Sequence, residues 1–222
     1  GVAPNEVTFS PDGTVAYSAN SGSNDISVID VASGTTVGLP IPVDAQPVSI
    51  AFVPNGSAAY VASNGGTVSV IDTASALVTD TIAIAGASFI EITPDGATAY
   101  VASFGTNTVV PLDVATGVAG TPIPVGSGPT GLAISPDGSR LYVANTWDGT
   151  VSAIDIATNT VITQIAVGPR PFQLTVSPDN SEVWVAVGDI NALAVIDAAT
   201  LETVATIAVG QNPRSVTISP DG

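Results

Sequence analysis

One short turn recurs along the whole 222-residue sequence at almost constant intervals. Each copy contains a proline, usually followed by Asp-Gly, and neighbouring copies lie 40 to 43 residues apart. The turn prolines are Pro11, Pro54, Pro94, Pro136, Pro178 and Pro220. Such a period indicates supersecondary units that bury their apolar faces against one another. This spacing constrains the fold more strongly than any other feature of the sequence.

Four short apolar runs, which we label A to D, fill the interval between one turn and the next. Run A precedes the proline, run B follows it, run C ends in aspartate, and run D is rich in Val, Ile and Thr. Four short strands in each repeat of about forty residues are typical of the blades of a β-propeller. The sequence therefore predicts an all-β protein, a β-propeller of four-stranded antiparallel blades with five complete repeats.

A sixth copy of run A, Ser215–Ser219, follows the fifth complete repeat. It predicts one extra innermost strand, so a closed ring of five blades would have two candidates for one strand position. We expect residues 1–222 to form a single propeller domain. Either the chain is a fragment of a longer propeller, or one terminal strand is displaced or pairs with another molecule. A fragment is favoured, because natural rings remove open blade edges that promote aggregation.

Two kinds of residue repeat with the turns and predict structural roles. An aromatic residue stands six positions after the turn proline in run B, and this regularity indicates core packing. These aromatic residues are Tyr17, Tyr60, Tyr100, Tyr142 and Trp184. The aspartates that end run C are expected to accept hydrogen bonds from the following turn. These aspartates are Asp30, Asp72, Asp113, Asp155 and Asp197.

The charge balance excludes two classes of partner. The chain has 19 acidic residues and only three cations, Arg140, Arg170 and Arg214, so its formal net charge is −16. Nucleic acids and anionic membrane surfaces are bound through clustered Lys and Arg, which this chain lacks. No run approaches the 18 consecutive apolar residues of a spanning helix, so we expect no membrane insertion. No signal-peptide pattern opens the sequence, and we expect a mature or trimmed form.

Several of the repeated residues also carry a family resemblance. They are the Ser-Pro-Asp-Gly turns, Tyr142–Asn145 (Tyr-Val-Ala-Asn), Thr150–Asp155, and Val167-Gly168 with Pro171. On these residues the chain resembles the YVTN family of β-propeller repeats along its whole length. The resemblance implies four-stranded antiparallel blades in a secreted or surface protein of bacteria or archaea, most often a binding or scaffold module. Members commonly have seven blades, and the five complete repeats of this chain depart from that number.

Candidate binding residues lie in the connections that differ between repeats. In an antiparallel four-stranded blade, the A–B and C–D turns lie at one end, and the B–C and D–A connections lie at the other, where a rigid scaffold can carry binding residues. Trp147, Asp148 and Phe104 lie in B–C loops, and Arg170 and Phe172 come from the following D–A connection. We predict that they form a patch for a protein or carbohydrate partner. The alternative is that Trp147 and Phe104 only cover blade junctions.

Glu91 is a charged residue in run A, three positions before Pro94, where the other repeats have only Thr or Ala. A charge in a slot of small residues is unfavourable unless it is solvated or paired. Glu91 is therefore a further candidate for ligand binding, reaching the central channel. The alternative is a solvated side chain in a wet channel.

The chain has no His and no Cys, which excludes His-based acid–base catalysis and Cys nucleophiles. We therefore predict a non-catalytic extracellular or cell-surface binding or scaffold module, with no catalytic residue, no cofactor and no metal site. A Ca²⁺ site built from Asp25, Asp44, Asp148 or Asp189 is a weaker alternative that needs only oxygen ligands. Two other classes stay open: a carboxylate-based propeller enzyme similar to a lactonase or lyase, and a structural repeat that self-associates through open blade edges.

Overall fold

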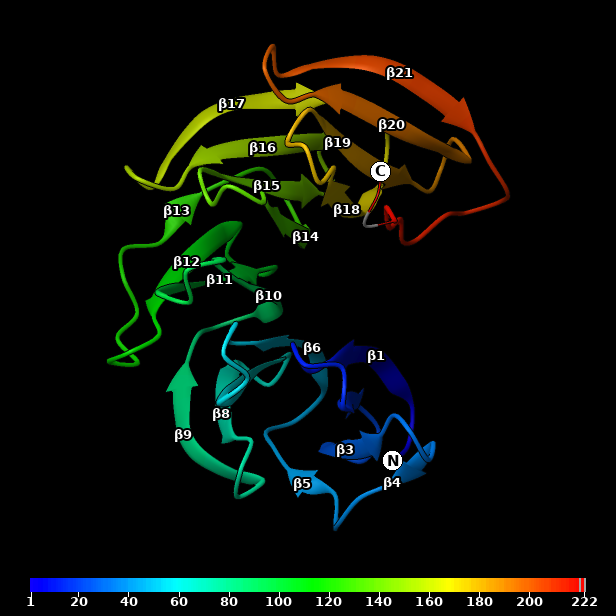
Figure 1. The fold of residues 1–222 in the computed structure, drawn as a ribbon. Helices are drawn as coiled ribbons and strands as arrows, with labels where there is room; N and C mark the ends of the chain where they lie inside the picture. The colour runs from blue at the N-terminus through cyan, green and yellow to red at the C-terminus, as the bar shows by residue number, and fades with distance from the viewer. Residues whose placement is uncertain (220, 222) are drawn as a thin grey trace. The chain divides into compact units, whose positions relative to one another are not determined.

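The structure is a computed structural model that describes residues 1–219 and 221, and these residues form five antiparallel β-sheets (Figure 1). They contain no helix, and therefore none that is long and apolar enough to cross a membrane. Consecutive strands pair within each sheet in the order of runs A to D, and in the first sheet run D is split into two pieces that both pair with run C. The predicted all-β architecture of four-stranded antiparallel blades is confirmed.

Each sheet is one sequence repeat. The first consists of β1 (Pro4–Phe9), β2 (Val15–Asn20), β3 (Asp25–Asp30), β4 (Thr35–Thr36) and β5 (Ile41–Pro42). The second consists of β6 (Pro47–Phe52), β7 (Ala58–Ser63), β8 (Thr67–Asp72) and β9 (Leu77–Ala83). The third consists of β10 (Ala87–Ile92), β11 (Thr98–Ser103), β12 (Thr108–Asp113) and β13 (Ile123–Pro124). The fourth consists of β14 (Pro129–Ile134), β15 (Arg140–Asn145), β16 (Thr150–Asp155) and β17 (Thr160–Ala166), and the fifth of β18 (Pro171–Val176), β19 (Glu182–Val187), β20 (Ala192–Asp197) and β21 (Glu202–Ala208).

The proline turns are stabilised by the residue that follows the proline. In the fourth sheet, Asp137 Oδ1 accepts hydrogen bonds from Ser135 Oγ at 2.6 Å and from the N–H of Ser139 at 3.0 Å. The equivalent residues Asp12, Asn55, Asp95 and Asp179 accept the same backbone bond. Hydrogen bonds to a carboxylate favour its charged form, so they lower the pKa of Asp137 and bring that of Asp179 to about 2.

The aspartates that end the third strand of each sheet have the predicted turn role. Asp155 Oδ1 accepts hydrogen bonds from the N–H of Thr158 at 2.8 Å and from its hydroxyl at 2.7 Å. Matching backbone bonds reach Asp30, Asp72, Asp113 and Asp197. Both repeated turns are therefore local structural elements.

The repeated tyrosines lie in the core. Tyr17, Tyr60, Tyr100 and Tyr142 are at most 3% exposed. The fifth residue of this series, Trp184, is only half-buried, and its Nε1–H donates to Glu182 Oε2 at 2.8 Å. The predicted packing role is confirmed for the tyrosines, whereas Trp184 lines a hollow of about 580 Å³.

The chain divides into two compact units. Unit 1 contains residues 1–101 and 110–120, and unit 2 contains residues 102–109 and 121–222. Unit 1 has two apolar clusters, one around Tyr17 and Ile26 and one around Tyr60 and Leu112. Unit 2 has one cluster around Tyr142, which continues from the fourth sheet into the fifth. The expectation of a single domain over residues 1–222 stays a prediction.

The last strand is the most exposed one in the second, fourth and fifth sheets, and it is irregular in the first and third. In the first sheet it is split into β4 and β5, and in the third it is reduced to β13. Proline residues occur in or next to these short strands, at Pro40, Pro42, Pro122 and Pro124. Proline has no N–H to donate, and a sheet tolerates it at an edge. The regular strand β21 is exposed along its whole length, although its neighbour β20 is mostly buried.

The predicted extra innermost strand, Ser215–Ser219, is wrong, because these residues are not in a strand. The segment lies beside β18, where the N–H of Gln173 donates to the carbonyl oxygen of Arg214 at 3.2 Å. In each sheet the first strand forms its ladder with the run B that follows it. Ser215–Ser219 belongs to none of the five sheets that the described residues form. The sixth turn proline, Pro220, lies outside the described residues.

Candidate functional site

In unit 2 the B–C loop of the fourth sheet lies against the D–A connection that precedes that sheet. The N–H groups of Thr146 and Trp147 donate to the carbonyl oxygens of Gly128 and Ser127 at 2.9 and 3.1 Å. The carboxylate of Asp148 accepts a further hydrogen bond from the N–H of Ser127 at 2.5 Å. These connections therefore meet at one end of the sheet, as its antiparallel order predicts, and we call this end of unit 2 the loop face.

Trp147 is the most prominent side chain of the loop face, with 65% of its surface exposed. Its ring meets that of Phe104 edge-on, with the ring centroids 4.6 Å apart and an interplanar angle of 70°. It also lies over Gly128, where an added Cβ would stand 3.0 Å from Cδ2 of the indole. Phe104 is half-buried. The two rings thus cover a loop junction, but most of Trp147 still faces solvent.

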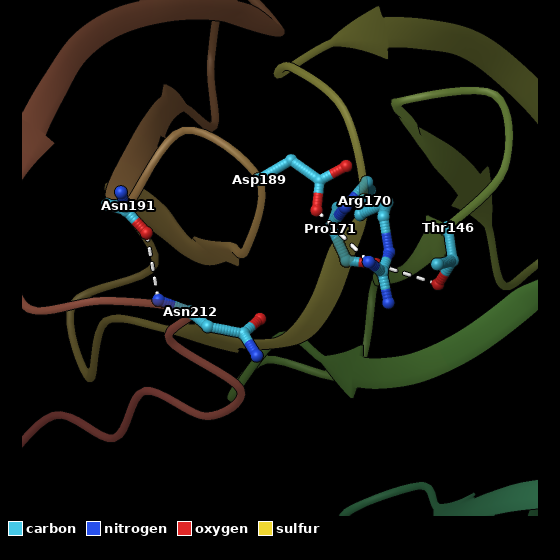
Figure 2. A network of polar contacts seen from close by, with 6 residues as sticks. All are labelled: Thr146, Arg170, Pro171, Asp189, Asn191 and Asn212. Atoms are coloured by element: carbon cyan, nitrogen blue, oxygen red, sulfur yellow. Dashed lines mark hydrogen bonds and ion pairs between the residues drawn. The ribbon is translucent and has the colours of Figure 1, made fainter.

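Arg170 and Phe172 form a second group on the same face. Arg170 Nη1 lies 3.1 Å from Asp189 Oδ1, and the two side chains are 48% and 43% exposed (Figure 2). The Arg170 guanidinium carbon stands 5.4 Å from the centre of the Phe172 ring. The hydroxyl of Thr146, which precedes Trp147, donates to the carbonyl oxygen of Pro171 at 2.7 Å. This bond connects the two groups, so the five predicted loop residues lie on connected segments of unit 2.

Sequence reasoning missed two features of the loop face. Arg214, which immediately precedes the expected strand Ser215–Ser219, places its guanidinium carbon 4.1 Å from the centre of the Phe172 ring. Asn191 Oδ1 accepts a hydrogen bond from the N–H of Asn212 at 2.9 Å (Figure 2). Asn24 and Asn107 make the same bond to later D–A connections. The sequence contains a repeated position that could have predicted this hydrogen bond, because each of these asparagines immediately precedes the third strand of its sheet.

Glu91 belongs to unit 1, whereas the other predicted residues belong to unit 2, and it lines a hollow of about 260 Å³. The hollow is also lined by Glu6, Ile50, Phe52 and Ile90. Burial, and secondarily the negative charge of Glu6, raises the pKa of Glu91 to about 8. The side chain is therefore held mainly in its neutral form at pH 7.

Glu6 is a further candidate residue, and it was not predicted from the sequence. Its Oε2 accepts a hydrogen bond from the N–H of Ile50 at 2.6 Å, which connects the first sheet to the second. Burial raises the pKa of Glu6, although hydrogen bonds from Ile50 and Ser49 act in the opposite direction. The hollow is thus lined by two carboxyl groups whose pKa values are both raised.

The four aspartates considered for calcium binding each accept a hydrogen bond from a different partner. Asp25 accepts a hydrogen bond from Asn20 Nδ2 at 2.8 Å, and Asp44 accepts one from Thr67 Oγ1 at 2.8 Å. Asp148 and Asp189 have the partners described above. Within the part of the chain that the structure describes, no three acidic side chains gather as a metal site would require.

Two solved structures show the same fold. One, titled Kuenenia stuttgartiensis hydrazine synthase, has a TM-score of 0.78 and 21% identity, over 99% of this chain and 90% of that chain. The other, from Desulfotomaculum acetoxidans DSM 771 and described as functionally unknown, has a TM-score of 0.83 and 18% identity, over 93% of this chain and 70% of that chain. Identities this low show likeness of fold alone.

Family models match two overlapping parts of the sequence. The model described as YNCE-like beta-propeller matches residues 130–222. The model described as lactonase, 7-bladed beta-propeller matches residues 50–161, just over half of the chain. No curated protein matches the sequence. With its repeated four-stranded sheets and this match, the chain belongs to the family of β-propeller proteins described as lactonase, 7-bladed beta-propeller.

Proposed function

We propose that this chain is a non-catalytic binding or scaffold module that engages a protein or carbohydrate partner through the loop face around Trp147. The observation that carries the proposal is the 65% exposure of Trp147 in a protein whose four tyrosines are at most 3% exposed. Large aromatic side chains are common anchors of binding interfaces. The part of Trp147 that does not cover the loop junction is therefore free to contact a partner.

The surroundings of Trp147 favour a preformed site. Phe104 meets one edge of the indole, Gly128 lies beneath it, and the carboxylate of Asp148 holds the loop to Ser127. A side chain that is already held in place loses little conformational freedom on binding, which favours affinity. A flat exposed ring suits the apolar face of a sugar as well as an apolar side chain of a protein.

The setting of the module is part of the same proposal. The resemblance to YVTN repeats supports an extracellular or cell-surface location, and the family matches support β-propeller repeats in general. A scaffold role through self-association would use the exposed edge strand β21, whose outer side presents unpaired backbone groups. The net charge of −16 supports the exclusion of nucleic acid as a partner.

A carboxylate-based hydrolase is the second candidate, favoured by the Glu6 and Glu91 pair and by the description of the matching family. In such an enzyme, neutral Glu91 would donate a proton and Glu6 would accept one. We rank it lower because the chain supplies neither His nor Cys to assist the pair. Lactone hydrolysis that is lost in both Glu91→Gln and Glu6→Gln, but retained in Trp147→Ala, would establish it over the binding role.

The binding role is tested by screening the protein on a glycan array and against purified candidate proteins, then measuring the affinity of Trp147→Ala for the partner found. We expect binding to weaken by about 2 kcal/mol or more, since Trp147 would be the central anchor. The thermal midpoint should change little, because most of the side chain contacts no protein.

Two control variants separate anchoring from general effects. Val204→Ala removes another exposed apolar side chain of unit 2, 58% exposed on β21, and should leave binding unchanged. Asp137→Ala alters a turn at the opposite end of the fourth sheet and should reduce stability while sparing binding. A large loss of stability in Trp147→Ala with unchanged affinity would show that the ring is a packing element and would refute the proposal.

A further inference from the structure

Two of the three cations of this acidic chain converge on one aromatic ring. The guanidinium carbons of Arg214 and Arg170 lie 4.1 and 5.4 Å from the centre of the Phe172 ring, within the range of cation–π interaction. The third cation, Arg140, donates instead to the carbonyl oxygen of Ala198. In a chain with 19 acidic residues, this cluster is an unusual concentration of positive charge.

The ring that carries the two arginines is itself held in place. An added Cβ at buried Gly188 would stand 2.7 Å from Cε2 of Phe172, so the ring lies directly on this backbone. The N–H of Gly188 donates to the carbonyl oxygen of Arg170 at 3.0 Å, and the N–H of Gln173 donates to that of Arg214 at 3.2 Å. The backbone at both arginines is therefore fixed relative to the ring.

The two guanidinium groups differ in their partners. Arg170 makes one contact to a carboxylate, Asp189 Oδ1 at 3.1 Å (Figure 2). Among the residues that the structure describes, this is the only ion pair, and Arg214 is not in it. Arg214 is exposed, so its N–H groups are available to an incoming ligand. A guanidinium stacked on a ring presents its N–H edge outward, and this planar edge matches a carboxylate through two parallel hydrogen bonds.

We infer that Arg214 and Arg170, mounted on Phe172, form a binding site for a carboxylate group, whether on a small organic acid or on an acidic side chain of a partner. Arg214 supplies the paired hydrogen bonds, and Arg170 adds a second positive charge. The negative charge of the rest of the chain repels anions, so carboxylates should concentrate at this site alone. The site stands independently of the Trp147 anchor, because none of its contacts uses the indole.

The experiment is a titration of the ¹⁵N-labelled protein with succinate, followed on the arginine Nε–Hε signals. The chain has only three arginines, so the spectrum holds three such signals, and single Arg→Gln variants assign them. We expect succinate to shift the signals of Arg214 and Arg170 with saturation, while Arg140 serves as an internal control. Sodium chloride at matched ionic strength should not reproduce the shifts.

Variants and a second anion sharpen the test. Arg214→Gln should weaken succinate binding at least tenfold on the remaining Arg170 signal, and Phe172→Leu should weaken it while leaving a folded amide spectrum. Trp147→Ala should leave binding unchanged.

Inorganic phosphate that saturates the same signals at lower concentration would overturn the assignment to carboxylates. Equal shifts of all three arginine signals, or no shift in the presence of succinate at tens of millimolar, would overturn the site itself. The source of the carboxylate is identified by comparing succinate with an acetylated Glu-containing tripeptide amide. Tighter binding of the peptide would identify a protein partner, and tighter binding of succinate would identify a small organic acid.

Discussion

Replacement of Glu91 by glutamine should remove a pH dependence of stability from unit 1. The native state holds the Glu91 proton up to a pKa of about 8, whereas the unfolded chain loses it near the ordinary value of 4.5. Between these values the native state binds more protons than the unfolded state, so the free energy of unfolding falls as pH rises. Below about pH 4.5 this loss is absent, and above about pH 8 it is complete.

The magnitude follows from the same shift. Each pKa unit corresponds to about 1.4 kcal/mol, so a rise from 4.5 to about 8 corresponds to at most about 5 kcal/mol. Glu91 is half-buried, and solvent screening reduces this value, so we expect about 2–4 kcal/mol. Glutamine has the shape of the neutral acid and cannot ionise. The variant should therefore match the parent protein near pH 4.5 and exceed it by this amount near pH 8.5.

The assay is urea denaturation followed by far-ultraviolet circular dichroism at intervals from pH 4.5 to 9. Circular dichroism reports on both units, whereas Trp147 and Trp184 both belong to unit 2. Glu202→Gln, which removes an exposed carboxylate on β21, is the matched control and should not change the slope. Parallel stability curves for the parent protein and Glu91→Gln across this range would refute the assignment of a retained proton.

Two further substitutions test the core and the loop face. Tyr142→Ala should lower the free energy of unfolding by about 3–5 kcal/mol, because a ring that is 1% exposed leaves a cavity when removed. An effect below about 1 kcal/mol in urea denaturation would contradict the packing role of this ring. Gly128→Ala should destabilise unit 2 and change the tryptophan emission, since the residue has a φ of 68° and the new Cβ would stand 3.0 Å from Trp147. Gly13→Ala is the matched control, with a φ of 69° and no atom within 4 Å of the added Cβ, and it should show backbone strain without an emission change.

Most of the fold was predictable because its determinants are local. The Asp137 turn and the Asp155 turn each involve residues within five positions of one another, so a repeated motif predicts a repeated turn. The buried tyrosines follow from the same register. The segment Ser215–Ser219 was mispredicted because similarity to run A does not show whether a segment pairs in a sheet, and this segment is in none.

Only those contacts of the candidate site that form between loops of successive repeats could be predicted from the sequence. Trp147 and Phe104 lie in the B–C loops of successive repeats, so their contact follows from the repeat order. Glu6 was missed because it stands at a different position of run A from Glu91, and they share a hollow only through the packing of neighbouring sheets. Arg214 was missed for the same reason, since its contact with Phe172 depends on where a non-strand segment lies. Packing of this kind leaves no periodic signal in a single sequence.

The exposure of β21 has a consequence for the dynamics of the fifth sheet. All of its residues are exposed, whereas β19 and β20 are mostly buried. Local opening is easiest where few buried apolar contacts must be broken. In deuterium exchange, the amides of β21 should therefore be labelled first and those of β19 last. Protection would then vary across the sheet, from strand to strand, and a partner that covers β21 would be detected as slowed exchange at this edge.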